Sequence, residues 1–126
     1  MSFEQIISGE VSSLRIAEDD EFLAFLESAP LATGHTVVIP KQKSEYIFSM
    51  EDSVLSRMHI FAKQVALKLE AAIPCQRIGM AVIGLQVAYS HIHLIPLQTV
   101  EDINFTREKF SPTEEELKAV YLQIIS

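Results

Sequence analysis

Apolar residues in the first third of the chain fall in short runs that are typical of strands. Residues 14–17 and residues 22–26 predict two short strands on either side of an acidic turn, and Pro30 ends the second one. The β-branched residues between Gly34 and Pro40, in GHTVVIPK, predict a third strand.

The spacing of apolar residues then changes from strand-like to helical. Ser49 with Asp52 marks a start, and Pro74 marks an end. These signals predict one long amphipathic helix through the middle of the chain. Its apolar face is expected to carry Val54, Leu55, Met58, Phe61, Ala62, Val65, Ala66 and Leu69.

Two more strands and a short helix are predicted in the C-terminal half. RIGMAVIG, residues 77–84, reads as one strand, and YSHIHLIP, residues 89–96, follows after a glycine-containing bend. In SPTEEELKAVYLQII, Ser111 is expected to cap the helix, with Pro112 at its first position and Glu114 completing a capping box.

Together these elements predict an α+β fold. About five antiparallel strands would form a sheet beside one long central helix and a short C-terminal helix. The chain has 126 residues, the length of one domain, and no linker or internal repeat divides it. One domain over residues 1–126 is therefore expected.

Composition limits the partners that this chain can have. The formal net charge of −7 argues against a nucleic-acid groove or an anionic membrane surface. A small phosphate ligand stays compatible, because screening beyond about 10 Å lets local donors outweigh distant charge. The single cysteine, Cys75, excludes an intramolecular disulfide and a cysteine-rich zinc site. MSFEQIISGE has no signal-peptide pattern, so a cytoplasmic protein without a membrane partner is expected.

The segment YSHIHLIP places two histidines in an otherwise apolar run. Side chains alternate in a strand, so Tyr89, His91 and His93 should share one face, while Ser90, Ile92 and Leu94 take the other. A lone histidine would most simply be structural. Two imidazoles beside a tyrosine favour a functional site, with a structural role as the alternative.

Three functions fit such a pair. His-x-His can hold a metal ion, although the first carboxylate downstream is Glu101, far from the pair. A neutral imidazole can instead attack phosphorus and form a covalent intermediate, with a second imidazole nearby keeping it neutral. The third possibility is a nucleotide-binding module without chemistry.

The same segment resembles the signature of the histidine-triad (HIT) superfamily of nucleotide hydrolases and transferases. That signature is His-x-His-x-His followed by two apolar residues, often ending in Ile-Pro, and GLQVAYSHIHLIP is similar to it. SGEVSSLRIAEDDEFLAFLESAPLATGHTVVIPK is similar to the N-terminal half of that family. The resemblance covers roughly Ile7 to Pro96.

This resemblance gives each histidine a place. His93 precedes the apolar pair and takes the third triad position, and His91 takes the middle position, which is the nucleophile in the family. Tyr89 stands where the family has its first histidine. His35 matches a histidine beside the catalytic cluster, with a structural hydrogen bond as its alternative role.

The resemblance also implies a nucleotide site. Glu27 matches an aspartate that binds the ribose hydroxyls, and Gly84 and Gln86 match the segment that wraps the α-phosphate. Phe25 and Leu26 would line the base pocket. The alternatives are a solvated acid for Glu27, a β-bulge for Gly84, and core packing for the two apolar residues.

The expected activity is a nucleotidyl hydrolase or transferase, of phosphoramidase or dinucleotide-polyphosphate hydrolase type, acting on a purine nucleotide or nucleotide conjugate. Neutral His91 would attack the α-phosphorus, and water would hydrolyse the nucleotidyl-His91 intermediate. His93 and Tyr89 would position or protonate groups around the phosphate, and a backbone carbonyl or a neighbouring group would hold the second ring nitrogen of His91. No metal and no cofactor is required by this chemistry. The resemblance also implies a homodimer, paired through the central helix and RIGMAVIG. The alternative is nucleotide binding with little or no turnover.

Overall fold

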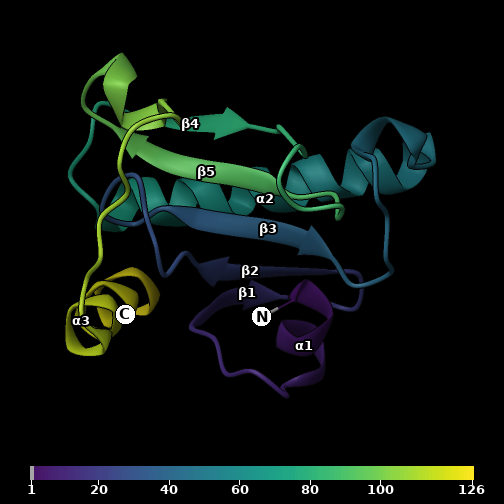
Figure 1. The fold of residues 1–126 in the computed structure, drawn as a ribbon, viewed down its shortest axis with the longest axis horizontal. Coiled ribbons are helices and arrows are strands. Elements are labelled where there is room, and N and C mark those ends of the chain that lie inside the picture. Colours follow the sequence, from purple (N-terminus) through teal and green to yellow (C-terminus); the bar gives the residue numbers. More distant parts are fainter. Residues whose placement is uncertain (1) are drawn as a thin grey trace.

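A computed structural model describes residues 2–126 of this protein. Its strands form one antiparallel sheet of five strands in the order β1-β2-β3-β5-β4 (Figure 1). The predicted sheet, long central helix and short C-terminal helix are confirmed. The strands are β1 (Arg15–Glu18), β2 (Phe22–Leu26), β3 (Thr36–Pro40), β4 (Arg77–Ala81) and β5 (Ile92–Leu97); the α-helices are α1 (Phe3–Ser8), α2 (Asp52–Ala72) and α3 (Glu114–Ile125); and the 3-10 turns are η1 (Ile47–Ser49) and η2 (Val100–Ile103).

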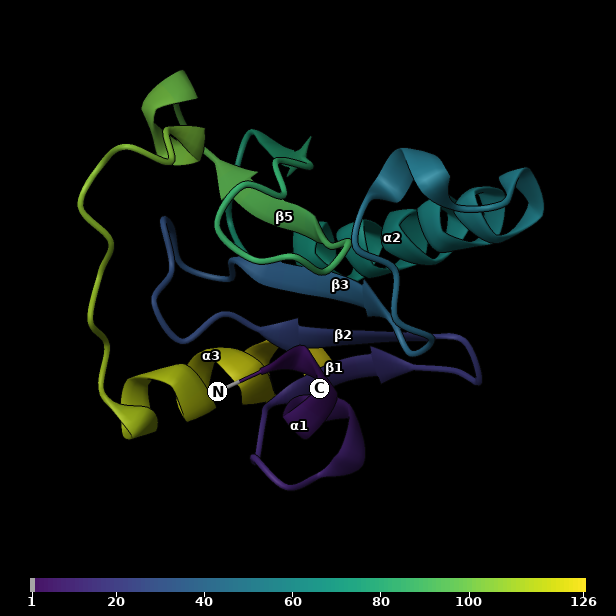
Figure 2. The ribbon, with the colours of Figure 1, turned by 45° about the vertical axis from the view of Figure 1, so that its right-hand side comes forward.

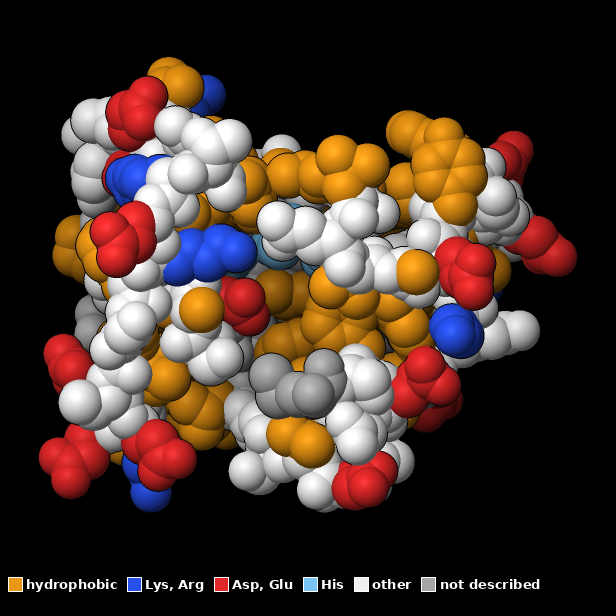
Figure 3. Space-filling view, in the orientation of Figure 1, with side chains coloured by type: hydrophobic (Ala, Val, Ile, Leu, Met, Phe, Trp, Pro, Cys, Tyr) orange, Lys and Arg blue, Asp and Glu red, His pale blue; other side chains and the backbone are white. Residues whose placement is uncertain are grey.

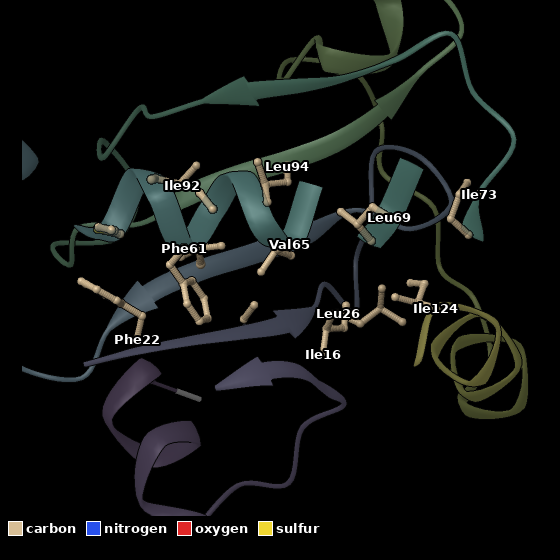
Figure 4. Close-up of a cluster of buried hydrophobic side chains, with 14 of the residues drawn as sticks. Ile16, Phe22, Leu26, Phe61, Val65, Leu69, Ile73, Ile92, Leu94 and Ile124 are labelled. Atoms are coloured by element: carbon tan, nitrogen blue, oxygen red, sulfur yellow. The ribbon is translucent and has the colours of Figure 1, made fainter. Parts of the chain in front are cut away.

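The main core lies between the sheet and α2, which runs behind the sheet in Figure 1. Every second residue of β2 faces this core, and the apolar stripe of α2 packs against it. Helix α3 closes one end through Ile124 (Figure 4). The labelled core residues are Ile16, Phe22, Leu26, Phe61, Val65, Leu69, Ile73, Ile92, Leu94 and Ile124.

A second, smaller core covers part of the opposite face of the sheet. The intervening residues of β2 and β3 form it with Tyr89, and α1 lies over them. Its buried members are Ile6, Leu23, Phe25, Val37, Ile39 and Tyr89. Helix α1 was not predicted, although Ser2 and Gln5 form a capping box and Gly9 ends the helix with φ of 85°. The remaining part of this face is where the histidines lie.

The segment before β5 differs from the prediction. Residues 82–91 are irregular, so β4 ends at Ala81 and β5 begins at Ile92 rather than at Tyr89. The end of this segment is held by contacts with residue 44 and not by pairing with a strand. The Ser90 backbone N–H donates to the Ser44 carbonyl. The side-chain hydroxyls of the same two serines lie 2.9 Å apart.

Helix ends also differ from the prediction by a few residues. The N-cap of α2 is Glu51, and Ser49 belongs to the preceding 3-10 turn η1. In α3 the capping box uses Thr113 and Glu116, because the Thr113 hydroxyl accepts from the Glu116 N–H and the Glu116 carboxylate accepts from the Thr113 N–H. The expected cap at Ser111 therefore lies outside the helix. None of the described helices is long and apolar enough to cross a membrane.

Candidate active site

Three histidines meet on the face of the sheet opposite α2. His35 immediately precedes β3, and His93 lies on β5 beside it, where it pairs with Val37. The rings of His35 and His93 are 5.1 Å apart, and those of His91 and His93 are 4.8 Å apart. The structure thus brings together three of the four predicted histidine and tyrosine rings as one cluster. His59, on α2, is exposed.

A chain of hydrogen bonds fixes the proton positions on His35 and His93. The Leu31 backbone N–H donates to Nδ1 of His35 over 3.0 Å, so this nitrogen carries no proton. His35 must then donate from Nε2 to Nδ1 of His93, 2.9 Å away. In neutral His93 the proton is consequently on Nε2, where it can be donated to a ligand.

His91 has the opposite tautomer. Its Nδ1 lies 2.6 Å from the carbonyl oxygen of Tyr89, and a carbonyl can only accept, so Nδ1 carries the proton. The group that holds the second ring nitrogen of His91 is therefore the Tyr89 carbonyl. Nε2 of neutral His91 keeps a free lone pair, which is the state that a nucleophile needs.

The cluster disfavours positive charge on two of its imidazoles. Burial, followed by the charge of Lys109, lowers the pKa of His35 to about 4. Burial again comes first for His93, followed by His35, His91 and Lys109, and lowers its pKa to about 3. Both rings are neutral at pH 7, as the hydrogen-bond chain requires.

A hollow of about 380 Å³ is lined by the residues predicted to bind the base and the ribose, and by residues of α3. Phe25, Leu26 and Glu27 contribute one wall, and Ile6 contributes another. The Glu27 backbone N–H donates to the His35 carbonyl over 2.9 Å, which joins the hollow to the cluster. Burial raises the pKa of the Glu27 carboxyl, with Lys109 opposing the shift. In Figure 3, histidine atoms are visible beside a basic side chain on this face.

The sequence matches the HIT domain family over residues 8–100. The chain belongs to the HIT family. An uncharacterized HIT-like protein of Borreliella burgdorferi is 32% identical over 130 residues, which cover 97% of this chain and 94% of that protein. A HIT-like protein from Bartonella henselae has the same fold, with a TM-score of 0.82, 26% identity, and coverage of 98% and 92% of the two chains. A HIT family hydrolase from Legionella pneumophila has a TM-score of 0.64 and 27% identity over 73% of this chain and 88% of its own.

The tyrosine at the first triad position of this HIT protein is turned into the second core. Tyr89 is 3% exposed, and its hydroxyl donates to the Pro40 carbonyl over 2.7 Å. Its ring meets Phe3 edge-on at 5.4 Å. Tyr89 contributes to the site through its main-chain carbonyl, which accepts a hydrogen bond from Nδ1 of His91. The expected place of the Tyr89 hydroxyl around the phosphate is therefore wrong, because the hydroxyl is buried in the second core and bound to Pro40.

Gly84 and Gln86 lie apart from this hydrogen-bonded cluster. Both are exposed on the irregular segment between β4 and β5. Gly84 has φ of 73° and open space where a Cβ would be, so its backbone conformation rather than a close approach favours glycine. Within residues 2–126, neither residue is a hydrogen-bond partner of the three histidines.

Two phenylalanines that the sequence did not indicate flank the cluster. Phe3 of α1 meets the His91 ring at 5.2 Å, and Phe105, just after η2, meets the His93 ring at 4.7 Å. The capping box at Ser2 could have indicated α1, but no periodic pattern marks the segment around Phe105. In the described part of the chain, no group of three or more His, Cys, Asp or Glu side chains is arranged to hold a metal ion.

Proposed function

We propose that this HIT protein is a nucleotidyl hydrolase or transferase that acts on the α-phosphate of nucleoside phosphoramidates or related purine nucleotide conjugates. The observation that carries the proposal is the pair of opposite tautomers at adjacent rings. His91 offers a lone pair at Nε2, and His93 offers a proton at Nε2. Transfer of a phosphoryl group needs a lone pair to attack phosphorus and a hydrogen-bond donor to stabilise a phosphoryl oxygen.

In the first step, Nε2 of His91 attacks the α-phosphorus, and a nitrogen–phosphorus bond forms as the bond to the leaving amine breaks. The amine leaves with a proton taken from solvent. His93 donates its Nε2 proton as a hydrogen bond to a phosphoryl oxygen, and the Tyr89 carbonyl accepts from the His91 ring, which becomes cationic in the intermediate. Water then attacks phosphorus, releases the nucleoside monophosphate with loss of a proton, and restores neutral His91.

The hollow lined by Phe25, Leu26 and Glu27 fits the nucleoside part of such a substrate. Phe25 and Leu26 give it an apolar wall for a purine base, and Glu27 gives it a carboxyl group for the ribose hydroxyls. The Glu27 main chain is hydrogen-bonded to His35, so the ribose contact and the histidine cluster keep a fixed separation. Gly84 and Gln86 are proposed to reach the phosphate only when the segment between β4 and β5 folds over a bound ligand.

The test compares His91→Ala with His59→Ala on adenosine 5′-phosphoramidate. His59 is the matched control, since it is an exposed histidine on α2, on the other side of the sheet. Loss of the nucleophile is expected to reduce kcat by about a thousandfold or more, and the control should retain full activity. Mass spectrometry of acid-quenched wild type should find the nucleotidyl group on His91. Equal rates for wild type and His91→Ala would contradict the catalytic proposal.

The second candidate is a nucleotide-binding protein with little turnover. The observation in its favour is Tyr89, which leaves two histidines where the family signature has three. Under this alternative, wild type binds adenosine 5′-monophosphate but hydrolyses the phosphoramidate no faster than His91→Ala. Calorimetric titration alongside the kinetic comparison separates the two candidates.

We also propose a homodimer, formed through the edge strand β4 and the neighbouring part of α2. Strand β4 is the last strand of the sheet order, so one of its edges is open to a second chain. Exposed apolar side chains continue from it, including Met80 and Val82, and α2 adds Ile60 and Leu67. Leu67 lies close to β4, since it lines a surface hollow together with Ile78. An apolar edge of this kind favours pairing between copies.

A further inference from the structure

The segment between η2 and α3 contacts the histidine cluster at one residue and is hydrogen-bonded to the loop between β2 and β3 at two others. Figure 2 shows it crossing from the β5 side of the sheet to α3. Phe105 packs on the rings of His93 and His35, with centroid distances of 4.7 and 6.3 Å. Arg107 donates to the Leu31 carbonyl, and the Phe110 N–H donates to the Pro30 carbonyl over 3.0 Å.

These anchors place Lys109 over the site. Lys109 lies between the fastened residues Arg107 and Phe110, and Leu31 is also the residue whose N–H binds His35. The Lys109 charge lowers the pKa of His35, of His93 and of the Glu27 carboxyl, and the Glu27 main chain is hydrogen-bonded to His35. The segment therefore carries a cation to the place where a phosphate would enter.

Lys109 is also available to a ligand. Near this face, Lys41 is bound to Glu18 and Lys43 to Glu4. Lys118 of α3 is a second exposed lysine, and it lines the nucleoside hollow rather than the histidine cluster. Arg107 is paired with Asp102 at 3.5 Å. Across residues 2–126, no ion pair within 4 Å involves Lys109, and its side chain is exposed.

The site needs such a cation. Phosphoryl transfer is accelerated by positive groups placed against the oxygens of the transferred group. His35 and His93 are neutral at pH 7, and Tyr89 cannot carry positive charge. An exposed lysine ammonium with three donors suits a phosphate oxygen as a point charge.

We propose that Lys109 binds a phosphoryl oxygen of the substrate at the His91 site, so that the segment 104–110 supplies the positive charge that the triad strand lacks. This inference rests on the proposed nucleotide function. It gives the segment a role in specificity, since it favours nucleotides over nucleosides. Glu27 and the apolar wall bind the parts that the two ligands share.

The experiment measures the dissociation constants of adenosine 5′-monophosphate and adenosine by calorimetry for wild type, Lys109→Gln and Lys109→Arg. Lys63→Gln is the matched control, because Lys63 is an exposed lysine on α2, away from the histidines. Lys109→Gln is expected to weaken binding of the monophosphate about tenfold and to leave adenosine binding unchanged. Lys109→Arg should stay within about threefold of wild type, because it keeps the charge.

Salt dependence gives a second readout that a merely structural role would not move. Wild-type affinity for the monophosphate should fall more steeply with salt than that of Lys109→Gln. Equal monophosphate binding by wild type and Lys109→Gln, with phosphoramidate turnover intact, overturns the inference alone. A loss that is equal for both ligands also overturns it, since it indicates a structural defect. If wild type shows neither turnover nor preference for the monophosphate over adenosine, the proposed function and the inference both fail.

Discussion

Replacing Tyr89 by phenylalanine tests whether the Tyr89 hydroxyl stabilises the fold or takes part in catalysis. The change removes one hydroxyl and leaves the ring, which packs on Phe3, and the main-chain carbonyl, which binds His91. The hydroxyl is buried and donates to the Pro40 carbonyl over 2.7 Å. Burial raises the pKa of this phenol, so it stays a protonated donor at neutral pH.

The expected effect falls on stability and spares catalysis. A typical intramolecular hydrogen bond contributes about 1 kcal/mol, and leaving a buried acceptor without its partner costs somewhat more. We therefore expect Tyr89→Phe to lose about 1–2 kcal/mol of unfolding free energy. For a chain of this length, that corresponds to a fall in Tm of about 5 °C. The value of kcat/KM should stay within about threefold, because the His91 tautomer is unchanged.

Urea denaturation and phosphoramidate kinetics on the same preparations test this expectation. Tyr46→Phe is the control, since Tyr46 is 60% exposed, and its stability should stay within about 0.5 kcal/mol of wild type. The reasoning is refuted if Tyr89→Phe is as stable as wild type while kcat falls tenfold or more. That result would place the hydroxyl on the substrate rather than on Pro40.

Two further predictions concern pH and assembly. In the folded protein the pKa of His35 is about 4 and that of His93 is about 3, so both rings stay neutral at mildly acidic pH. Unfolded histidines take up protons near pH 6.5. The free energy of unfolding is therefore highest above pH 6.5 and falls as the pH falls towards 4. At pH 5 the loss of unfolding free energy should approach about 2 kcal/mol for each ring. The raised pKa of Glu27 opposes this loss, because its carboxyl takes up a proton more readily in the folded protein. Urea denaturation from pH 7 to 5 measures the change, and a flat profile would contradict the prediction. The double variant Leu67→Lys with Met80→Lys should elute as a monomer in size-exclusion chromatography with light scattering, while wild type elutes at twice the monomer mass. A wild-type monomer would rule out the β4 interface.

Local patterns predicted the regular elements well. Strand β2 has the predicted bounds, Phe22–Leu26, because five consecutive apolar residues between turns leave few alternatives. The α2 stripe was equally clear, since its spacing repeats over a helix of 21 residues. Helix α1 was not predicted, because six residues are too few to show the repeated spacing of apolar residues that marks a helix.

Features that depend on distant contacts could not be predicted in the same way. The start of β5 is set by Ser44 and by Pro40, whose carbonyls bind the Ser90 N–H and the Tyr89 hydroxyl. The sequence identified His35, His91 and His93 but could not assign their tautomers, which depend on a loop N–H and a carbonyl. The position of Phe105 against His93 follows from anchors more than 70 residues away, such as Leu31 bonded to Arg107.

The hydrogen bonds that begin at Leu31 determine which group of the site donates and which accepts. Each member donates to the next, from the Leu31 N–H to His35 and from His35 to His93, so the last group presented to a ligand is an N–H. A ligand atom that meets it must accept. An ester or phosphate oxygen satisfies this condition, and an ammonium or amide N–H at the same place does not. The loop between β2 and β3 thereby selects ligands by the polarity of one hydrogen bond, several ångströms from the atom that enforces it.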